Sequence, residues 1–197
     1  MRIVSGLAGG VRLEAPPGRE VRPTSDRVKE SLFGSLGDIQ GWTVVDLFAG
    51  SGALGLEALS RGASRVVLFD TNARSLACVQ QNLAAVQRAA PDLPGTAEVI
   101  RADAASAPQR LAELAGGVDL LLADPPYHPA AHEYGAEKLI QDLAMARWAS
   151  GALLVVEHAA DTCLVWHPKS PWRLLRMRTF GSRCLSFARQ VGAPAAP

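Results

Sequence analysis

Residues 43–70 read TVVDLFAGSGALGLEALSRGASRVVLFD. An apolar run is followed by a glycine-rich turn, a helix-forming segment and a second apolar run. This order predicts a buried strand at 43–47, a turn at 50–55, a helix at 53–60 and a second strand at 64–69. Apolar strands that alternate with helices are typical of a parallel sheet covered by helices on both faces. The stretch therefore favours a doubly wound α/β fold.

The same alternation extends along the rest of the chain. Further strands are expected at 98–101, 118–123 and 152–157, and helices at 25–36, 72–88, 106–115 and 134–148. Two runs around Gly181-Ser182, at 172–179 and 183–189, predict a C-terminal β-hairpin. Short β-like runs at 2–5 and 11–14 predict a small N-terminal β arm.

Length and composition are those of an ordinary globular chain. The 197 residues, 48% of them hydrophobic and 20% charged, suit one domain with a small appendage. We expect a basic β-hairpin arm at 1–23, a main domain at 24–191 and a tail at 192–197. The three cysteines include no CxxC pair, so neither a disulfide framework nor a cysteine zinc site is indicated. No apolar run reaches the ~18 residues of a membrane span and no signal peptide is recognised, so a cytoplasmic protein is expected.

The net charge of +1 hides an uneven distribution along the chain. Residues 1–31 carry a net charge of +2, residues 32–161 one of −7 and residues 162–197 one of +6, with no acidic residue in the last segment. Basic ends around an acidic middle indicate a polyanionic partner if the two ends meet in space. Arginine-rich strands that are simply solvated would give the same pattern, so the sequence leaves both interpretations open.

The turn GSGALG at 50–55 fits the pattern G-x-G-x-x-G and has the preceding strand and following helix that this motif requires. Gly50 and Gly52 allow a tight turn and the close approach of a ligand to the backbone. Asp70 ends the next strand, where it can accept hydrogen bonds from both hydroxyls of a ribose. We therefore expect a cofactor that contains a nucleoside. A glycine turn beside a helix-capping aspartate is the purely structural alternative.

Asp46 indicates which cofactor this would be. It lies inside the first strand, four residues before Gly50. A dinucleotide pyrophosphate is an anion and prefers a helix N-terminus without an extra carboxylate. S-adenosylmethionine instead carries an ammonium group and a sulfonium cation, and Asp46 suits the ammonium directly or through water. Asp103, after the third strand, is a candidate acceptor for the adenine amino group, although capping of the following helix explains it equally well.

The tetrapeptide Asp124-Pro125-Pro126-Tyr127 directly follows the apolar strand at 118–123. Its two prolines fix φ and remove two N–H donors, so the loop is rigid and presents acceptors. The Asp124 carboxylate and the Pro125 carbonyl can accept the two N–H groups of an exocyclic amino group and direct its lone pair at a methyl group. Tyr127 can stack on the base, a contact worth about 1–3 kcal/mol. Positioning and electrostatics would then supply most of the catalysis on an unpaired or flipped-out base.

Two motifs, DLFAGSGALGLEALSRGA (46–63) and DPPY (124–127), resemble those of class I methyltransferases that act on exocyclic amino groups. With RPTSDRVKESLF (22–33) and TFGSRCLSFA (179–188), the chain resembles the RsmD family over nearly its whole length. The resemblance implies a Rossmann-like methyltransferase sheet of about seven mostly parallel strands with a reversed final strand. It also implies S-adenosylmethionine as cofactor and methylation of N2 of a guanine in bacterial small-subunit rRNA. The partner would be ribosomal RNA or a partly assembled small ribosomal subunit, with no membrane and no metal.

Together, the motifs and the resemblance predict three sets of site residues. The catalytic set is Asp124, Pro125, Pro126 and Tyr127. The cofactor-binding set is Asp46, Phe48, Ala49, Gly50, Ser51, Gly52, Ala53, Asp70, Thr71, Asn72, Asp103 and Ala104. The RNA-binding set is Arg2, Arg12, Arg22, Arg27 and Lys29. The family often carries a second acid at the place of Asn72, which can cap a helix but adds no charge.

Three other functions remain open on the sequence. A DNA adenine-N6 methyltransferase shares DPPY, but 197 residues leave little room for a target-recognition domain. An NAD(P)-dependent oxidoreductase shares the glycine turn but does not explain DPPY. A non-catalytic RNA-binding module explains the basic ends but not the carboxylates at four strand ends. His128 and His132 are four residues apart, yet Pro129 interrupts any helix there, so no metal site is predicted.

Overall fold

The computed structural model describes residues 1–16, 25–127, 129–162 and 164–190. The chain divides into two compact units, Met1–Ala102 and Asp103–Pro197. The predicted boundary between the N-terminal arm and the main domain, and the predicted tail, both lie outside the described residues.

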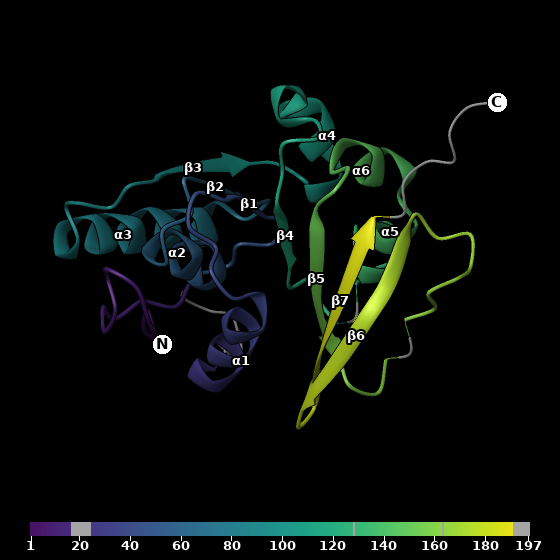
Figure 1. Ribbon diagram of the computed structural model, residues 1–197, viewed down its shortest axis with the longest axis horizontal. Coiled ribbons are helices and arrows are strands. Elements are labelled where there is room, and N and C mark those ends of the chain that lie inside the picture. The colour runs from purple at the N-terminus through teal and green to yellow at the C-terminus, as the bar shows by residue number, and fades with distance from the viewer. Residues whose placement is uncertain (17–24, 128, 163, 191–197) are drawn as a thin grey trace. The chain divides into compact units, whose positions relative to one another are not determined.

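The first unit alternates helices and parallel strands (Figure 1). Its elements are α1 (Asp26–Leu36), β1 (Thr43–Asp46), α2 (Ala53–Ser60), β2 (Arg65–Asp70), α3 (Ala73–Ala89) and β3 (Thr96–Arg101). β2 lies between β1 and β3 and is parallel to both, with Val66 opposite Val44 and Ala97. Each of these elements starts and ends within two residues of its predicted position.

Capping side chains and one glycine explain where these elements begin and how they pack. The Ser25 hydroxyl accepts a hydrogen bond from Val28 N (3.3 Å) at the start of α1, and Asn72 caps α3 in the same way. Every residue of α2 is buried. A Cβ added to Gly55 would lie 2.8 Å from a Leu68 methyl carbon on β2. The third glycine of the motif therefore allows close packing of helix on strand.

The N-terminal arm is held by a buried side chain as well as by backbone hydrogen bonds between its two segments, such as Ile3 N to Val11 O (2.8 Å). A single antiparallel bridge joins Arg2 and Arg12, so the two predicted strands of the arm are reduced to one pair of residues. The carboxylate of Glu57 on α2 accepts hydrogen bonds from Val4 N (2.7 Å) and Ser5 N (3.0 Å). These backbone groups bond to a side chain, which satisfies them without a neighbouring strand.

Lys29 on α1 is fully buried. Its ammonium contacts the Arg2 carbonyl and lies 3.5 Å from a carboxylate oxygen of Glu57, which is also fully buried. Burial lowers the pKa of Lys29, and the negative charge of Glu57 opposes this shift. The prediction that Lys29 contacts RNA is therefore wrong, because its charge is enclosed by the protein and engaged by Glu57.

In its described residues, the second unit contains four strands. Its elements are the 3-10 turns η1 (Ala104–Ser106) and η2 (Ala112–Leu114), the helices α4 (Ala107–Arg110), α5 (Ala136–Gln141) and α6 (Leu143–Trp148), and the strands β4 (Leu120–Ala123), β5 (Leu153–Ala159), β6 (Trp172–Phe180) and β7 (Arg183–Gln190). β4 and β5 are parallel, and β7 is antiparallel to both β5 and β6. The predicted C-terminal hairpin is confirmed and lies along β5 (Figure 1).

Two predicted helices are divided in the structure. The helix expected at 106–115 is the short α4 between two 3-10 turns, because the backbone leaves the helical region at Leu111 (φ −121°, ψ 43°). The helix expected at 134–148 is split at Asp142 into α5 and α6. The Asp142 side chain accepts hydrogen bonds from Ala144 N (2.8 Å) and Met145 N (3.0 Å), and so starts a new helix.

The seven strands of the described residues are mostly parallel, and among them the antiparallel pairs are β5 with β7 and β7 with β6. This arrangement, with helices between the parallel strands, confirms the predicted α/β class. In the described part of the chain, no helix has the length and apolar character that a membrane crossing requires.

Candidate active site

The glycine turn joins β1 to α2 in a conformation that requires glycine at two positions. Gly50 has a φ of 56° and Gly52 a φ of 81°, both in the left-handed region. Gly52 is the N-cap of α2, and its N–H donates to the Ala49 carbonyl (2.6 Å). The structure therefore has the tight turn that the sequence predicts.

The turn leaves space beside Gly50. Apart from Gly50 itself and its two chain neighbours, no atom of the described residues lies within 4 Å of the position that a Cβ on Gly50 would occupy. A Cβ on Gly52 would instead lie 3.1 Å from the Leu56 side chain. Gly50 is thus open on one side, and a ligand can approach its backbone more closely than any side chain would allow.

Asp46 ends β1 just before the turn and is 1% exposed. One carboxylate oxygen accepts a hydrogen bond from Gly55 N (3.1 Å) and the other from Phe48 N (3.4 Å). Burial raises the pKa of Asp46 to about 7, against the opposing effect of these two N–H groups. A cation placed next to this carboxylate would favour its charged form, whereas an anionic pyrophosphate there would be repelled.

Asp70 ends β2 and ties the glycine turn to this strand. One of its carboxylate oxygens accepts a hydrogen bond from Gly50 N (3.0 Å) and the other from Asn72 N (2.8 Å). The residue is half-buried, and Thr71 and Asn72 beside it are exposed. A carboxylate has about four acceptor sites, so these two bonds leave capacity for ribose hydroxyls.

Asn82 on α3 contacts the glycine turn, which the sequence did not predict. Its side-chain N–H groups donate to the carbonyls of Ser51 (2.9 Å) and Glu14 (3.0 Å), and its oxygen accepts from Glu14 N (2.8 Å). Asn82 therefore holds both the glycine turn and the N-terminal arm. A polar residue between Val79 and Val86 on the apolar face of a predicted helix is the signal that could have found it.

The remaining predicted cofactor residues of the first unit lie in the turn itself. Phe48 is half-buried, whereas Ala49, Ser51 and Ala53 are buried. The Ser51 hydroxyl donates to the sulfur of Met1 (3.2 Å). Close approach to the backbone is therefore what these buried positions offer a ligand.

Asp103 and Ala104 begin the second unit. The Asp103 side chain accepts a hydrogen bond from Ala105 N (2.8 Å) and caps η1, which is the structural role that the sequence left open. Ala104 is buried. Capping engages one carboxylate oxygen, and binding of an adenine amino group by Asp103 stays a prediction.

The DPPY loop continues directly from β4. All four residues of β4 are buried, so the loop is anchored at its start. Pro125 is buried, Asp124 and Tyr127 are half-buried and Pro126 is exposed. The loop therefore combines a fixed backbone with partly accessible side chains at its two ends.

The side chain of Tyr127 is held by Glu157 of β5. The Tyr127 hydroxyl donates to Glu157 Oε1 (3.0 Å), and Arg183 Nη1 on β7 donates to the same oxygen (3.0 Å). Burial raises the pKa of Glu157, and the positive charge of Arg183 opposes this shift. Burial also raises the pKa of Tyr127, and the negative charge of Glu157 raises it further. The phenol therefore stays a hydrogen-bond donor. The signal for Glu157 was an acid at the end of the apolar run ALLVVE (152–157).

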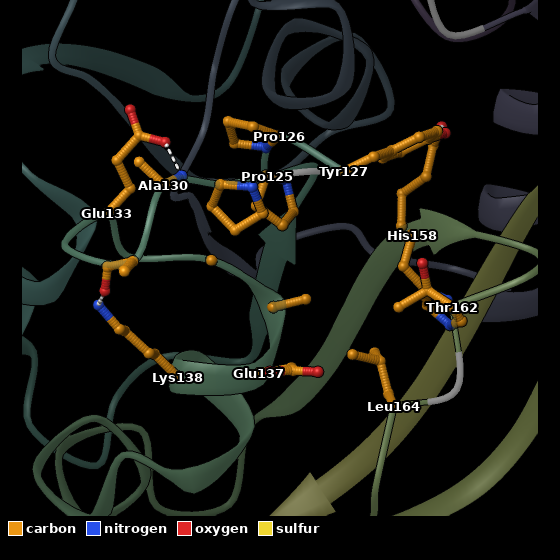
Figure 2. A pocket seen from close by; sticks show the side chains of 15 residues that line it. Pro125, Pro126, Tyr127, Ala130, Glu133, Glu137, Lys138, His158, Thr162 and Leu164 are labelled. Atoms are coloured by element: carbon orange, nitrogen blue, oxygen red, sulfur yellow. Dashed lines mark hydrogen bonds between the residues drawn. The ribbon is translucent and has the colours of Figure 1, made fainter.

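A pocket of about 420 Å³ lies beside the DPPY loop, within the second unit. Figure 2 shows Pro125, Pro126 and Tyr127 on one side of it and Leu164 across from them. This volume is in the range of sites for small ligands. His128, next to the loop, lies outside the described residues. Among the residues that are described, no three His, Cys, Asp or Glu side chains gather as a metal ion would require.

The predicted RNA-binding residues of the first unit differ in exposure. Arg2, Arg12 and Arg27 are exposed, and Arg22 lies outside the described residues. Arg2 Nε forms an ion pair with Asp26 at 2.9 Å, which balances part of its charge. RNA binding by Arg2, Arg12 and Arg27 stays a prediction, and the ion pair with Asp26 lowers the charge that Arg2 could offer to a phosphate.

Comparison with known proteins finds relatives that match most of this chain. The family model described as Conserved hypothetical protein 95 matches residues 1–189. The chain is 34% identical over 183 residues to Ribosomal RNA small subunit methyltransferase D of Escherichia coli strain K12, covering 92% of this chain and 85% of that protein. The solved structure of yhhF from Escherichia coli has a TM-score of 0.74 and 31% identity, covering 96% of this chain and 97% of that chain. The chain shares its fold with the rRNA methyltransferase aviRa from Streptomyces viridochromogenes. That structure is 22% identical and has a TM-score of 0.67, covering 94% of this chain and 92% of that chain.

Proposed function

This chain belongs to the RsmD family of small-subunit ribosomal RNA methyltransferases, and we propose that it transfers a methyl group from S-adenosylmethionine to N2 of a guanine in that RNA. The family that the motifs indicate is thereby confirmed. The relative from Escherichia coli carries the name of an rRNA methyltransferase, which favours this function over DNA methylation, hydride transfer or RNA binding alone. A cytoplasmic location stays a prediction.

The first unit would hold the cofactor. Asp46 would bind the ammonium group, Asp70 would accept hydrogen bonds from the ribose hydroxyls, and the backbone at Gly50 would lie against the ligand. Bound S-adenosylmethionine supplies an electrophilic methyl group on a sulfonium sulfur. The observation that carries the proposal is Asp46, because a fully buried carboxylate behind the glycine turn suits a cationic ligand and disfavours a pyrophosphate.

The second unit would hold the amine. The Asp124 carboxylate and the Pro125 carbonyl would accept the two N–H groups of N2 and leave its lone pair directed at the methyl carbon. Tyr127 would stack on the base, with its hydroxyl fixed by Glu157 at 3.0 Å. Bound S-adenosylmethionine would supply the methyl group and leave as S-adenosylhomocysteine, and Asp124 or water would take the one proton that the amine loses.

The experiment is labelled methyl transfer followed by nucleoside analysis. Three substrates are compared: protein-free small-subunit rRNA, partly assembled small subunits and DNA. The expected product is N2-methylguanosine in at least one of them. Label in adenosine, or label in DNA alone, would contradict the proposal.

Substitution of Asp124 separates the two roles. Asp124→Ala should abolish transfer while calorimetry with S-adenosylmethionine gives an affinity close to that of the wild type. Asp70→Ala is the matched variant and should weaken cofactor binding first, because Asp70 fixes Gly50 N at 3.0 Å. The reverse pattern would show that the roles are assigned incorrectly.

A further inference from the structure

A bulge in β6 sets which of its side chains share a face. The register of β6 against β7 shifts by one residue between Leu174 and Arg176, so Leu175 is the extra residue of a β-bulge. Successive residues of a regular strand point to opposite faces. Without the bulge, Arg173 would lie on the face opposite to Arg176 and Arg178. The one-residue shift brings all three arginines to one face.

Pairing across the hairpin adds a fourth arginine to this face. Residues directly opposite in antiparallel strands have their side chains on the same face. Three rows cross β6, β7 and β5: Arg173–Arg189–Leu153, Arg176–Phe187–Val155 and Arg178–Leu185–Glu157. The guanidinium of Arg176 lies 4.4 Å from the centroid of the Phe187 ring, in agreement with this register. We call Arg173, Arg176, Arg178 and Arg189 the arginine ridge.

The arginine ridge lies on the same face of the second unit as the group that holds Tyr127. Glu157 occupies the row of Arg178, two strands away, so at a strand spacing of about 4.8 Å their Cα atoms are roughly 10 Å apart. The ridge thus extends along the sheet edge from the row next to the DPPY loop.

Charge and exposure make this face suited to an anion. All four arginines are exposed, and residues 162–197 contain no acidic residue. β6 is an edge strand: it is last in the strand order, and its outer edge pairs with no other described strand. A face that carries four exposed cations has a positive potential, which attracts a polyanion that lies along it.

We propose that the arginine ridge binds the phosphate backbone of the substrate RNA and directs the strand toward the pocket beside Tyr127. The substrate is RNA by the proposed function, on which this inference rests. A second copy of the chain added to the β6 edge is the less favourable occupant, because like charges placed next to each other across a strand pair destabilise it.

The test compares salt dependence of RNA binding. The ridge variant is Arg173→Gln/Arg178→Gln. The control is Arg110→Gln/Arg147→Gln, which removes two exposed cations of the same unit that lie on α4 and α6 and not on the hairpin. Filter binding uses a radiolabelled small-subunit rRNA transcript. Loss of two phosphate contacts makes the negative slope of log affinity against log salt shallower by about 1.5. When salt is raised from about 50 to 200 mM, the affinity of the wild type should therefore fall about eightfold more than that of the ridge variant. The control should keep the wild-type slope.

Equal slopes for wild type and ridge variant would overturn the inference. Loss of a dimer in sedimentation with unchanged RNA binding would also overturn it, in favour of a copy interface. The single variants Arg173→Gln and Arg178→Gln keep the test open if the double variant does not fold, and each should lower the slope by about half as much.

Methyl transfer distinguishes this inference from the proposed function. The ridge variant should raise the KM for RNA and leave kcat unchanged. If the wild type places no methyl group on rRNA while the ridge variant still loses its salt-dependent RNA affinity, the proposed function fails and the ridge stands. If the wild type methylates rRNA and the ridge variant matches it in both KM and slope, the ridge fails and the function stands.

Discussion

Asp46→Asn tests the electrostatics of the candidate cofactor site through the stability of the ligand-free protein. Burial raises the pKa of Asp46 from its ordinary 3.8 to about 7. A carboxyl whose pKa is raised by folding contributes stability below its unfolded pKa and loses it as pH rises toward the folded pKa. Each pKa unit corresponds to about 1.4 kcal/mol, so above pH 7 the charged carboxylate costs the wild-type fold about 4 kcal/mol.

In the wild type, Asp46 accepts hydrogen bonds from Gly55 N and Phe48 N. Asparagine has the same shape, but its NH2 group cannot accept, so one of these two hydrogen bonds is lost. Loss of that hydrogen bond costs about 1–2 kcal/mol at every pH. The ligand-free variant should therefore be more stable than the wild type by about 2–3 kcal/mol at pH 8 and less stable by about 1–2 kcal/mol near pH 4. Urea unfolding at the two pH values, followed by tryptophan fluorescence, measures the difference.

The same variant should bind S-adenosylmethionine at least about tenfold more weakly, because it lacks the charge that would pair with the ammonium group. Wild-type affinity should fall as pH decreases through 7, where Asp46 becomes protonated, and the affinity of the variant should not. Calorimetry at pH 6 and 8 measures both. A variant that is less stable than the wild type at pH 8, or that binds the cofactor equally well, would refute the reasoning.

Three further substitutions test the packing and the network around the site. Gly55→Ala should destabilise the fold by about 1–3 kcal/mol in urea unfolding, since the new methyl group would press on β2 at 2.8 Å, and an unchanged midpoint would contradict the packing role. Lys29→Met removes a buried partner of Glu57 and should lower the free energy of unfolding by about 3 kcal/mol, measured by thermal unfolding. A variant as stable as the wild type would show that Arg61 and the backbone N–H donors are enough to stabilise the Glu57 carboxylate. Tyr127→Phe should lower kcat about tenfold with unchanged cofactor affinity, because the ring stays but its link to Glu157 is lost, and an unchanged kcat would mean that this link does not orient the ring.

Local signals were enough to predict most of the fold. The glycine turn, the strands around it and the cap at Asn72 were placed within two residues, because apolar runs and capping residues act over a few positions. The break at Asp142 was also local, but an aspartate inside an otherwise helical pattern is compatible with both a continuous helix and a new start. Pattern alone therefore cannot separate one helix from two there.

The errors and omissions at the site come from contacts between residues distant in sequence. The sequence predicts Lys29 as an RNA contact because it shows only the charge, whereas the enclosure of that charge depends on Glu57, on a different helix. The hold of Glu157 on Tyr127 joins two strands, and Asn82 reaches both the glycine turn and the arm. Such contacts follow from the folded arrangement and have no short-range signature.

Gly50 is fixed in place before any ligand arrives. Its N–H is bonded to Asp70 at 3.0 Å, and the carbonyl of the next residue accepts a bond from Asn82 at 2.9 Å. The conformational entropy of this turn is therefore lost during folding, and cofactor binding does not have to order the turn a second time. Cofactor capture should accordingly be a one-step encounter in stopped-flow mixing, with an observed rate that rises linearly with cofactor concentration and no slower loop-closing phase.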